Sequence, residues 1–140
     1  MTNDETLLIY EEELKQADEV LRALVIESQI KCALIINQDG SLIWQHGETG
    51  SLDTTSLAAL AAGGFAATKE IARLIGEPGF SILFHQGEKE HVHLNLVGED
   101  ALLMLLFDDR TTIGLVRVLA KDASERLLEI FSASSKPLPS

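Results

Sequence analysis

Three of the four histidines lie close together in the second half of the chain, where they could bind a metal. His91 and His93 alternate with apolar residues, so in a strand both side chains point to one face, and His85 lies in the preceding segment. No cysteine or carboxylate completes a convincing ligand set around them. Histidines two residues apart on the wetter face of a strand are usually surface residues. We therefore expect no metal and no other cofactor, and a metal-binding sensor stays as an alternative.

The segment 108–112 resembles a catalytic cluster, with two aspartates, an arginine and two threonines directly before a predicted helix. Such carboxylates and hydroxyls accept hydrogen bonds from the free amides of a helix's first turn, so helix capping is the expected role. Cys32 lies in an aliphatic run and is interpreted as a small buried hydrophobic residue. Phosphate-binding glycine loops and nucleophile elbows are absent from the sequence. We expect a protein without an active site of its own.

The composition is that of one acidic, aliphatic domain. The chain has 22 acidic and 11 basic residues, a formal net charge of −11, and no basic cluster suited to nucleic acid or to an anionic membrane. Hydrophobic residues make up 46% of the chain and aromatic residues 5%, which predicts a core of Leu, Ile, Val and Ala. The N-terminal residues 1–5 are acidic and lack the basic and long apolar regions of a signal peptide, and no apolar run approaches the length of a membrane span. A cytoplasmic protein is expected.

Hydrophobic periodicity predicts three helices and five strands. Apolar residues recur at three- and four-residue steps in the predicted helices 10–28, 53–75 and 112–131. Short apolar or alternating runs between turn residues predict strands at 31–37, 41–46, 80–86, 91–97 and 101–107. This order predicts an α/β (α+β) sandwich with an antiparallel sheet in a domain of residues 10–131, while 1–9 and 132–140 are expected to be disordered.

The apolar pattern also predicts which strands and faces are covered. The strands 31–37 and 101–107 are apolar almost throughout and are expected at the centre of the sheet. In the strand 91–97 the apolar residues alternate with polar ones. This alternation predicts a covered face with Val92, Leu94 and Leu96 and a wetter face with His91, His93 and Asn95.

The central helix has a clear start and end and two stripes of small or apolar residues. Asp53 is expected to cap it through the amide of Thr55 or Ser56, and Gly76 to end it in a left-handed conformation before Pro78. The stripe expected to face the sheet consists of Leu57, Leu60, Gly64, Ala67, Ile71 and Leu74. The second stripe has no large apolar side chain in its first turns and consists of Ala59, Ala62, Gly63, Ala66, Glu70 and Arg73.

Two adjacent glycines inside this helix require an explanation. Gly63 and Gly64 each cost about 1 kcal/mol relative to alanine in a helix interior, so close packing is the expected compensation. Two partners fit that role: the protein's own sheet, or a second chain that approaches the helix closely. The second stripe is too apolar for an ordinary solvated surface, which favours the second chain.

Taken together, the order of the elements and several motifs resemble the roadblock / dynein light-chain family, and within it the bacterial MglB type. The motifs span residues 53–60, 74–77 and 107–117, with further similarity to the MglB type at 10–13 and 84–87. The resemblance implies a roadblock/longin-like fold, a five-stranded antiparallel sheet with the central helix on one face and the terminal helices on the other. It also implies a homodimer in which central helices lie side by side and the strands 80–86 pair, with an interface at Leu60, Gly64, Phe80, Ile82 and Phe84.

The resemblance further implies a function. MglB-type proteins are GTPase-activating proteins for a small Ras-like GTPase that sets cell polarity and drives gliding or twitching motility. They rearrange the switch regions of the GTPase and supply no arginine finger, so Arg73, Arg110 and Arg117 are not expected to act as one. The positions that face the GTPase in this family carry over onto Ala59, Ala62, Gly63, Ala66 and Glu70.

Two departures from the family pattern favour a second interpretation, a roadblock scaffold or adaptor that binds a GTPase or motor component without changing hydrolysis. Glu70 places a charge where a small residue is expected. The sequence ends at Ser140, whereas MglB-type proteins carry a longer C-terminal extension with a helix linked to nucleotide exchange. An exchange-factor role is therefore not expected.

Overall fold

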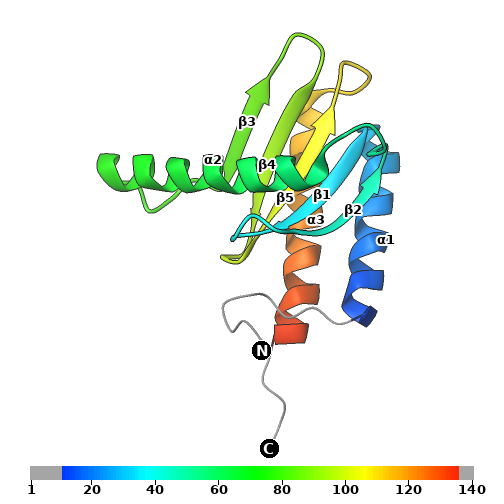
Figure 1. Cartoon of the computed structure of the whole chain (residues 1–140), viewed down its shortest axis with the longest axis horizontal. Helices are drawn as coiled ribbons and strands as arrows, with labels where there is room; N and C mark the ends of the chain where they lie inside the picture. Colours follow the sequence, from blue (N-terminus) through cyan, green and yellow to red (C-terminus); the bar gives the residue numbers. More distant parts are fainter. Residues whose placement is uncertain (1–10, 136–140) are drawn as a thin grey trace, which may run out of the picture.

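The apolar runs of the sequence form one antiparallel sheet between two helical layers (Figure 1). The computed structural model describes residues 11–135. Its elements, in chain order, are α1 (Glu11–Ser28), β1 (Cys32–Asn37), β2 (Leu42–Gly47), α2 (Thr54–Ile75), β3 (Ile82–Gln86), β4 (His91–Val97), β5 (Ala101–Phe107) and α3 (Ile113–Ser135). The predicted fold and element order are confirmed. No helix within residues 11–135 is long and apolar enough to cross a membrane.

The sheet has the strand order β2-β1-β5-β4-β3, with all neighbours antiparallel. β1 and β5 are central and almost completely buried, as their apolar sequences predict. β2 and β3 are the two edges. At the β1–β2 turn Gly40 has a φ of 93°, a conformation that residues with a side chain rarely adopt.

Each face of the sheet has its own hydrophobic core. On one face α1 and α3 pack against Ile35 and Leu103. On the other face α2 covers Leu34 and Met104. Cys32 belongs to this second core, and burial raises the pKa of its thiol to about 11. The prediction that Cys32 is a small buried hydrophobic residue is therefore confirmed.

The ends of α2 are those predicted from the sequence. Asp53 Oδ1 accepts a hydrogen bond of 3.1 Å from the Ser56 amide, and Gly76 has a left-handed φ of 80°. The α2 residues that join the core beneath it lie between Leu57 and Phe65. The C-terminal half of the helix extends past the sheet in Figure 1. This overhanging half leaves much of α2 without a covering element.

Two boundaries differ from those predicted by more than one residue. The ladder between β3 and β4 begins at the pair Ile82–Asn95, two residues later than the strand expected from Phe80. α3 continues to Ser135 because no helix-breaking residue precedes Pro137, so the first four residues of the predicted tail are helical. Residues 1–10 and 136–140 lie outside the described residues. The predictions that fall on them are disorder at 1–9 and 136–140 and helix at residue 10.

Candidate interaction surface on the central helix

The stripe of α2 predicted to face the sheet faces away from it instead. Leu60 is 73% exposed and Leu74 is 70% exposed, and of that stripe only Leu57 joins the core. The fully buried positions of the helix are Ala58, Phe65 and Ala72. Ala58 and Phe65, with Leu57, Ala61 and Ala62 packed beside them, fill the space between α2 and the sheet. The prediction that they cover the sheet is wrong.

The exposed apolar residues of α2 form one continuous surface, which we call the open face. It consists of Leu60, Gly63, Gly64, Ala67, Ile71, Leu74 and Ile75. A Cβ atom added at Gly63 or Gly64 would meet nothing within 4 Å. These glycines do not pack against the protein's own sheet, so nothing within the described chain compensates for their conformational cost. An exposed apolar surface of this kind is typical of an interface.

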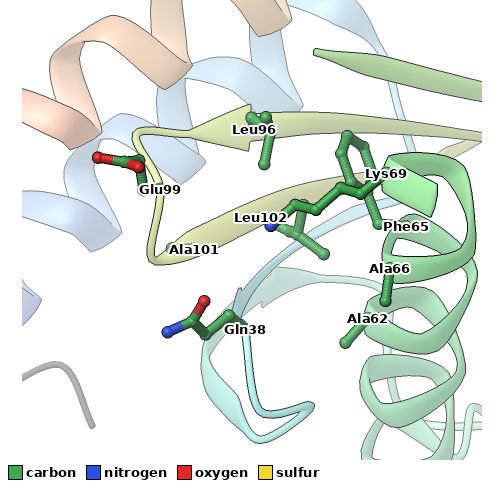
Figure 2. A pocket seen from close by; sticks show the side chains of 9 residues that line it. All are labelled: Gln38, Ala62, Phe65, Ala66, Lys69, Leu96, Glu99, Ala101 and Leu102. Carbon is green, nitrogen blue, oxygen red and sulfur yellow. The ribbon is translucent and has the colours of Figure 1, made fainter. Parts of the chain in front are cut away.

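The alanines predicted to face a GTPase lie on a different side of α2, which we call the alanine flank. A Cβ atom added at Gly40 would lie 3.2 Å from the Ala59 Cα, so this alanine sits against the β1–β2 turn. Ala62 and Ala66 line a cavity between α2 and the sheet (Figure 2). Of the other predicted positions, Gly63 belongs to the open face, and Glu70 is exposed next to the alanine flank and pairs with Arg73.

The predicted dimer residues on and near β3 do not share one setting. Phe80 precedes the strand and lines a cavity under α2. Ile82 and Phe84 are half-buried, and the Phe84 ring stacks on that of Phe107 with 6.2 Å between the centroids. This contact holds Phe84 on the face of the sheet that α3 covers. β3 therefore offers mainly its free backbone edge, because only β4 pairs with it.

The three histidines do not meet at one site. His93 pairs with Phe84 and His85 with Val92 in the β3–β4 ladder, so His85 lies on the opposite face from His91 and His93. Within residues 11–135, no group of three or more His, Cys, Asp or Glu side chains is placed to hold a metal ion. The geometry therefore offers no support for a metal-binding sensor.

The face of β4 predicted to be wetter is buried against α3. His91 and Asn95 are each 7% exposed, and His93 is completely buried. His93 Nε2 lies 3.0 Å from the Asn95 Oδ1, and His91 Nε2 lies 3.0 Å from an Asp109 oxygen. Polar side chains can be buried when they find such partners, so their alternation with apolar residues did not indicate exposure. The predicted exposure of this face is wrong.

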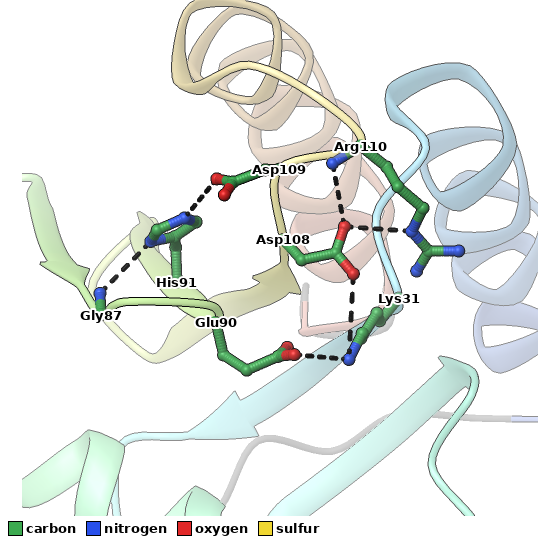
Figure 3. A network of polar contacts seen from close by, with 7 residues as sticks. All are labelled: Lys31, Gly87, Glu90, His91, Asp108, Asp109 and Arg110. Atoms are coloured by element: carbon green, nitrogen blue, oxygen red, sulfur yellow. Dashed lines mark hydrogen bonds and ion pairs between the residues drawn. The ribbon is translucent and has the colours of Figure 1, made fainter.

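The cluster before α3 separates into structural contacts (Figure 3). Thr112 Oγ1 accepts a hydrogen bond of 3.3 Å from the Leu115 amide, which confirms capping for this residue. Asp108 accepts hydrogen bonds from the Arg110 amide and guanidinium, both at 3.0 Å, and lies 3.9 Å from Lys31. These hydrogen bonds hold the pKa of the Asp108 carboxyl below its usual value. The arrangement joins the ends of β1 and β5 and leaves no nucleophile beside a free base.

The Gly87 amide donates a 3.2 Å hydrogen bond to His91 Nδ1. The hydrogen of this imidazole therefore lies on Nε2, where it is donated to Asp109. Both ring nitrogens of His91 have partners, so the side chain ties the β3–β4 turn to the loop before α3 (Figure 3). This role is structural.

Comparisons with known proteins agree with the fold and with the sequence motifs. The Roadblock/LC7 domain family matches residues 16–107. The structure of Myxococcus xanthus MglB is 39% identical, with a TM-score of 0.87 over 95% of this chain and 100% of that one. The gliding protein MglB from Thermus thermophilus is 34% identical, with a TM-score of 0.85 over 91% of this chain and 96% of that one. An uncharacterized protein of Methanocaldococcus jannaschii is 29% identical over 81% of this chain and 98% of its own length. The protein belongs to the Roadblock/LC7 domain family and is of the MglB type.

Proposed function

We propose that this protein is a homodimeric regulator of a small Ras-like GTPase in the cytoplasm, and that it activates GTP hydrolysis. The open face of α2 is the observation that carries the proposal. It exposes Leu60, Ile71 and Leu74 beside two glycines whose surroundings are empty. In a chain of the MglB type, such a surface is best explained by contacts with other protein chains.

The two surfaces of α2 allow self-pairing and GTPase binding to occur together. In the proposed homodimer the open face, with Leu60 and Gly64, packs against the same helix of a second copy. The free edge of β3 pairs with β3 of the second copy. This strand includes Ile82 and Phe84 and follows Phe80. The alanine flank then stays accessible, and Ala59, Ala62 and Ala66, with Glu70 beside them, form the proposed GTPase contact. Gly63 lies at the border of the two surfaces and would be shared by both contacts.

The proposed activation uses no catalytic group from this protein. Arg73 is held by Glu70, Arg110 is held by Asp108, and Arg117 lies on α3 in the opposite helical layer. Binding that favours the hydrolysis-competent arrangement of the switch regions is sufficient, because a partner can accelerate a reaction by selecting one conformation. The attacking water and the groups that act on it then belong to the GTPase. Through the GTPase, the protein would regulate cell polarity and gliding or twitching motility.

Hydrolysis measurements test the proposal directly. GTP turnover by the Ras-like GTPase from the same genome is measured with and without this protein, and we expect a faster rate in its presence. Ala66→Arg places a long charged side chain on the alanine flank and should abolish the acceleration. Val118→Arg, at a position on α3 that is 67% exposed, is the matched control and should leave the acceleration intact. An unchanged rate with the wild-type protein would refute the activator role.

A roadblock scaffold or adaptor is the second candidate. The observation that favours it is the Glu70–Arg73 pair, which places a polar group beside the proposed GTPase contact where the family pattern expects a small residue. A scaffold would bind the GTPase without changing its rate. Binding measured by calorimetry together with an unchanged hydrolysis rate would select the scaffold.

A further inference from the structure

A groove runs beneath the middle of α2, between this helix, the sheet and the β1–β2 and β4–β5 turns. It is formed by two adjoining cavities that share Gln38, Lys69, Leu96 and Glu99. The first cavity lies closer to the middle of α2, and the second continues toward Phe80. Within the first cavity Phe65, Leu96 and Leu102 provide an apolar floor (Figure 2).

Lys69 is the cation of this groove and lines both of its cavities. In Figure 2 its side chain extends from α2 toward the strands that carry Leu96 and Leu102, and Lys69 is exposed to solvent. The carboxylate of Glu99, on the β4–β5 turn, points away from it in the same view. Within residues 11–135, no carboxylate lies within ion-pair distance of the Lys69 amine. The groove therefore combines an apolar floor with an unpaired positive charge.

Several other cations of this acidic protein already have a carboxylate partner. Lys31 pairs with Glu90, Arg73 with Glu70, and Arg110 with Asp108. The aliphatic stem of a lysine can lie along apolar side chains while its charged amine stays in solvent. Lys69 is thus positioned to receive an acidic group from another molecule.

We propose that this groove receives a segment of the GTPase that carries one acidic side chain between apolar ones, and that its carboxylate pairs with Lys69. The inference rests on the proposed function, because Ala62 and Ala66 belong both to the groove and to the proposed GTPase contact. The side-chain amide of Gln38 lies at the rim of the groove and can donate to the same carboxylate (Figure 2).

The outer end of the groove restricts what this segment can be. Asp100 lines that end together with Phe80 and Pro78, and Glu99 lines both cavities. The negative charges of Glu99 and Asp100 repel a second acidic residue, whereas apolar residues are accepted by the floor. The partner segment that fits has a single acidic residue opposite Lys69, with apolar residues on both sides of it.

Two substitutions of Lys69 separate charge from packing. Lys69→Met keeps most of the aliphatic stem and removes the charge, and Lys69→Glu reverses the charge. Lys121→Met, at an exposed lysine of α3, is the matched control on the opposite helical layer. Affinity is measured by fluorescence anisotropy with the Ras-like GTPase from the same genome, loaded with a non-hydrolysable GTP analogue. Circular dichroism confirms that each variant is folded.

We expect Lys69→Met to weaken binding by roughly 3- to 10-fold at about 0.05 M salt, and Lys69→Glu to weaken it further. Because salt screens a partly exposed ion pair, the differences should shrink strongly at about 0.5 M salt. Lys121→Met should bind like the wild-type protein at both salt concentrations.

The outcomes distinguish the groove from the proposed function. If the wild-type protein binds the GTPase and both Lys69 variants bind equally well, the groove inference is wrong and the proposed function stands. A loss of the same size at both salt concentrations also overturns it, because the role of Lys69 would then be packing. If the wild-type protein itself does not bind, the proposed function fails and the groove inference fails with it.

Discussion

Glu70 and Arg73 form a bidentate ion pair on the exposed side of α2. Arg73 Nε lies 3.0 Å from one carboxylate oxygen of Glu70 and 3.1 Å from the other, and Arg73 Nη2 makes a further contact. The hydrogen bonds from Arg73 lower the pKa of the Glu70 carboxyl, so the pair stays ionised at neutral pH. The negative charge beside the proposed GTPase contact is therefore accompanied by its counter-ion, which reduces the repulsion it exerts on a docking partner.

This pair predicts the effect of removing the arginine. Arg73→Ala should change the acceleration of GTP hydrolysis by no more than about 2-fold, because Arg73 is held by Glu70 and is not free to reach the nucleotide. Loss of an arginine finger, in contrast, costs roughly 10³- to 10⁵-fold. Single-turnover hydrolysis at saturating regulator distinguishes the two cases. A loss of about 100-fold or more, within reach of the finger range, would show that Arg73 leaves Glu70 and acts as a finger.

A second prediction concerns the homodimer. Leu60→Glu places a charge on the open face and should convert the dimer into a monomer, because an unpaired carboxylate is costly to bury between two helices. The fold itself should be preserved, since Leu60 is 73% exposed in the single chain. Light scattering after size exclusion gives the mass in solution.

Val118→Glu is the control for this prediction. Val118 is 67% exposed but lies on α3, in the opposite helical layer. The control should remain dimeric. If Leu60→Glu is dimeric as well, the two copies do not meet through the open face.

The two helical glycines give a third prediction, in which stability and assembly change in opposite directions. An added Cβ at Gly63 or Gly64 meets nothing within 4 Å in the single chain, so alanine at either position should stabilise the monomer by about 1 kcal/mol. In the proposed dimer, the same methyl group separates closely packed helices and should weaken association. Urea unfolding of each glycine variant in the Leu60→Glu background measures the stability of the monomer. Dilution of the dimer that carries only the glycine substitution measures its dissociation constant.

Gly114→Ala provides the comparison for association. Gly114 lies on α3, and a Cβ atom there also meets nothing within 4 Å. This variant should leave the dimer dissociation constant unchanged. If Gly63→Ala and Gly64→Ala also leave it unchanged, close helix packing is not the reason for the two glycines.

Local signals predicted the elements of this fold more reliably than the faces they present. Asp53 and Gly76 marked the ends of α2 because capping and the left-handed conformation depend on only a few neighbouring residues. The face of α2 could not be predicted in the same way. Leu60 and Phe65 both belong to apolar stripes with helical spacing, and periodicity does not say which stripe meets the sheet when the other meets a second chain.

The sequence predicted only some of the residues at the candidate site. The sequence identified Ala62 and Ala66 as contact residues through small size and family resemblance. It gave no sign that Lys69 lies in the same groove, because Gln38 and Leu96 reach this groove from distant parts of the chain. A lysine at the edge of a helical stripe is most often an ordinary solvated residue, and only the fold places it over an apolar floor.

The buried His93 gives the last prediction, which concerns stability at acidic pH. Burial is the largest cause that lowers the pKa of His93 from its usual 6.5; the charge of Arg117 lowers it further, and the hydrogen bond with Asn95 opposes the shift. The unfolded state therefore binds more protons than the folded state as the pH falls below about 6.5. The contribution of the neutral His93 to the free energy of unfolding is complete above that pH. It is lost as the pH decreases toward the pKa of His93 in the folded state. Urea unfolding from about pH 7.5 to about pH 5 should show a decreasing free energy of unfolding, in a range where most carboxylates stay ionised.

Replacement of the imidazole separates this contribution from other acid effects. His93→Gln keeps a polar group beside Asn95 but cannot gain a proton, so its free energy of unfolding should depend less steeply on pH than that of the wild-type protein. His85→Gln, at an exposed position on the other face of the sheet, should keep the wild-type slope. Equal slopes for His93→Gln and the wild-type protein would mean that His93 can gain its proton without leaving its position under α3. The imidazole would then be stabilised in its charged form by the surrounding polar groups.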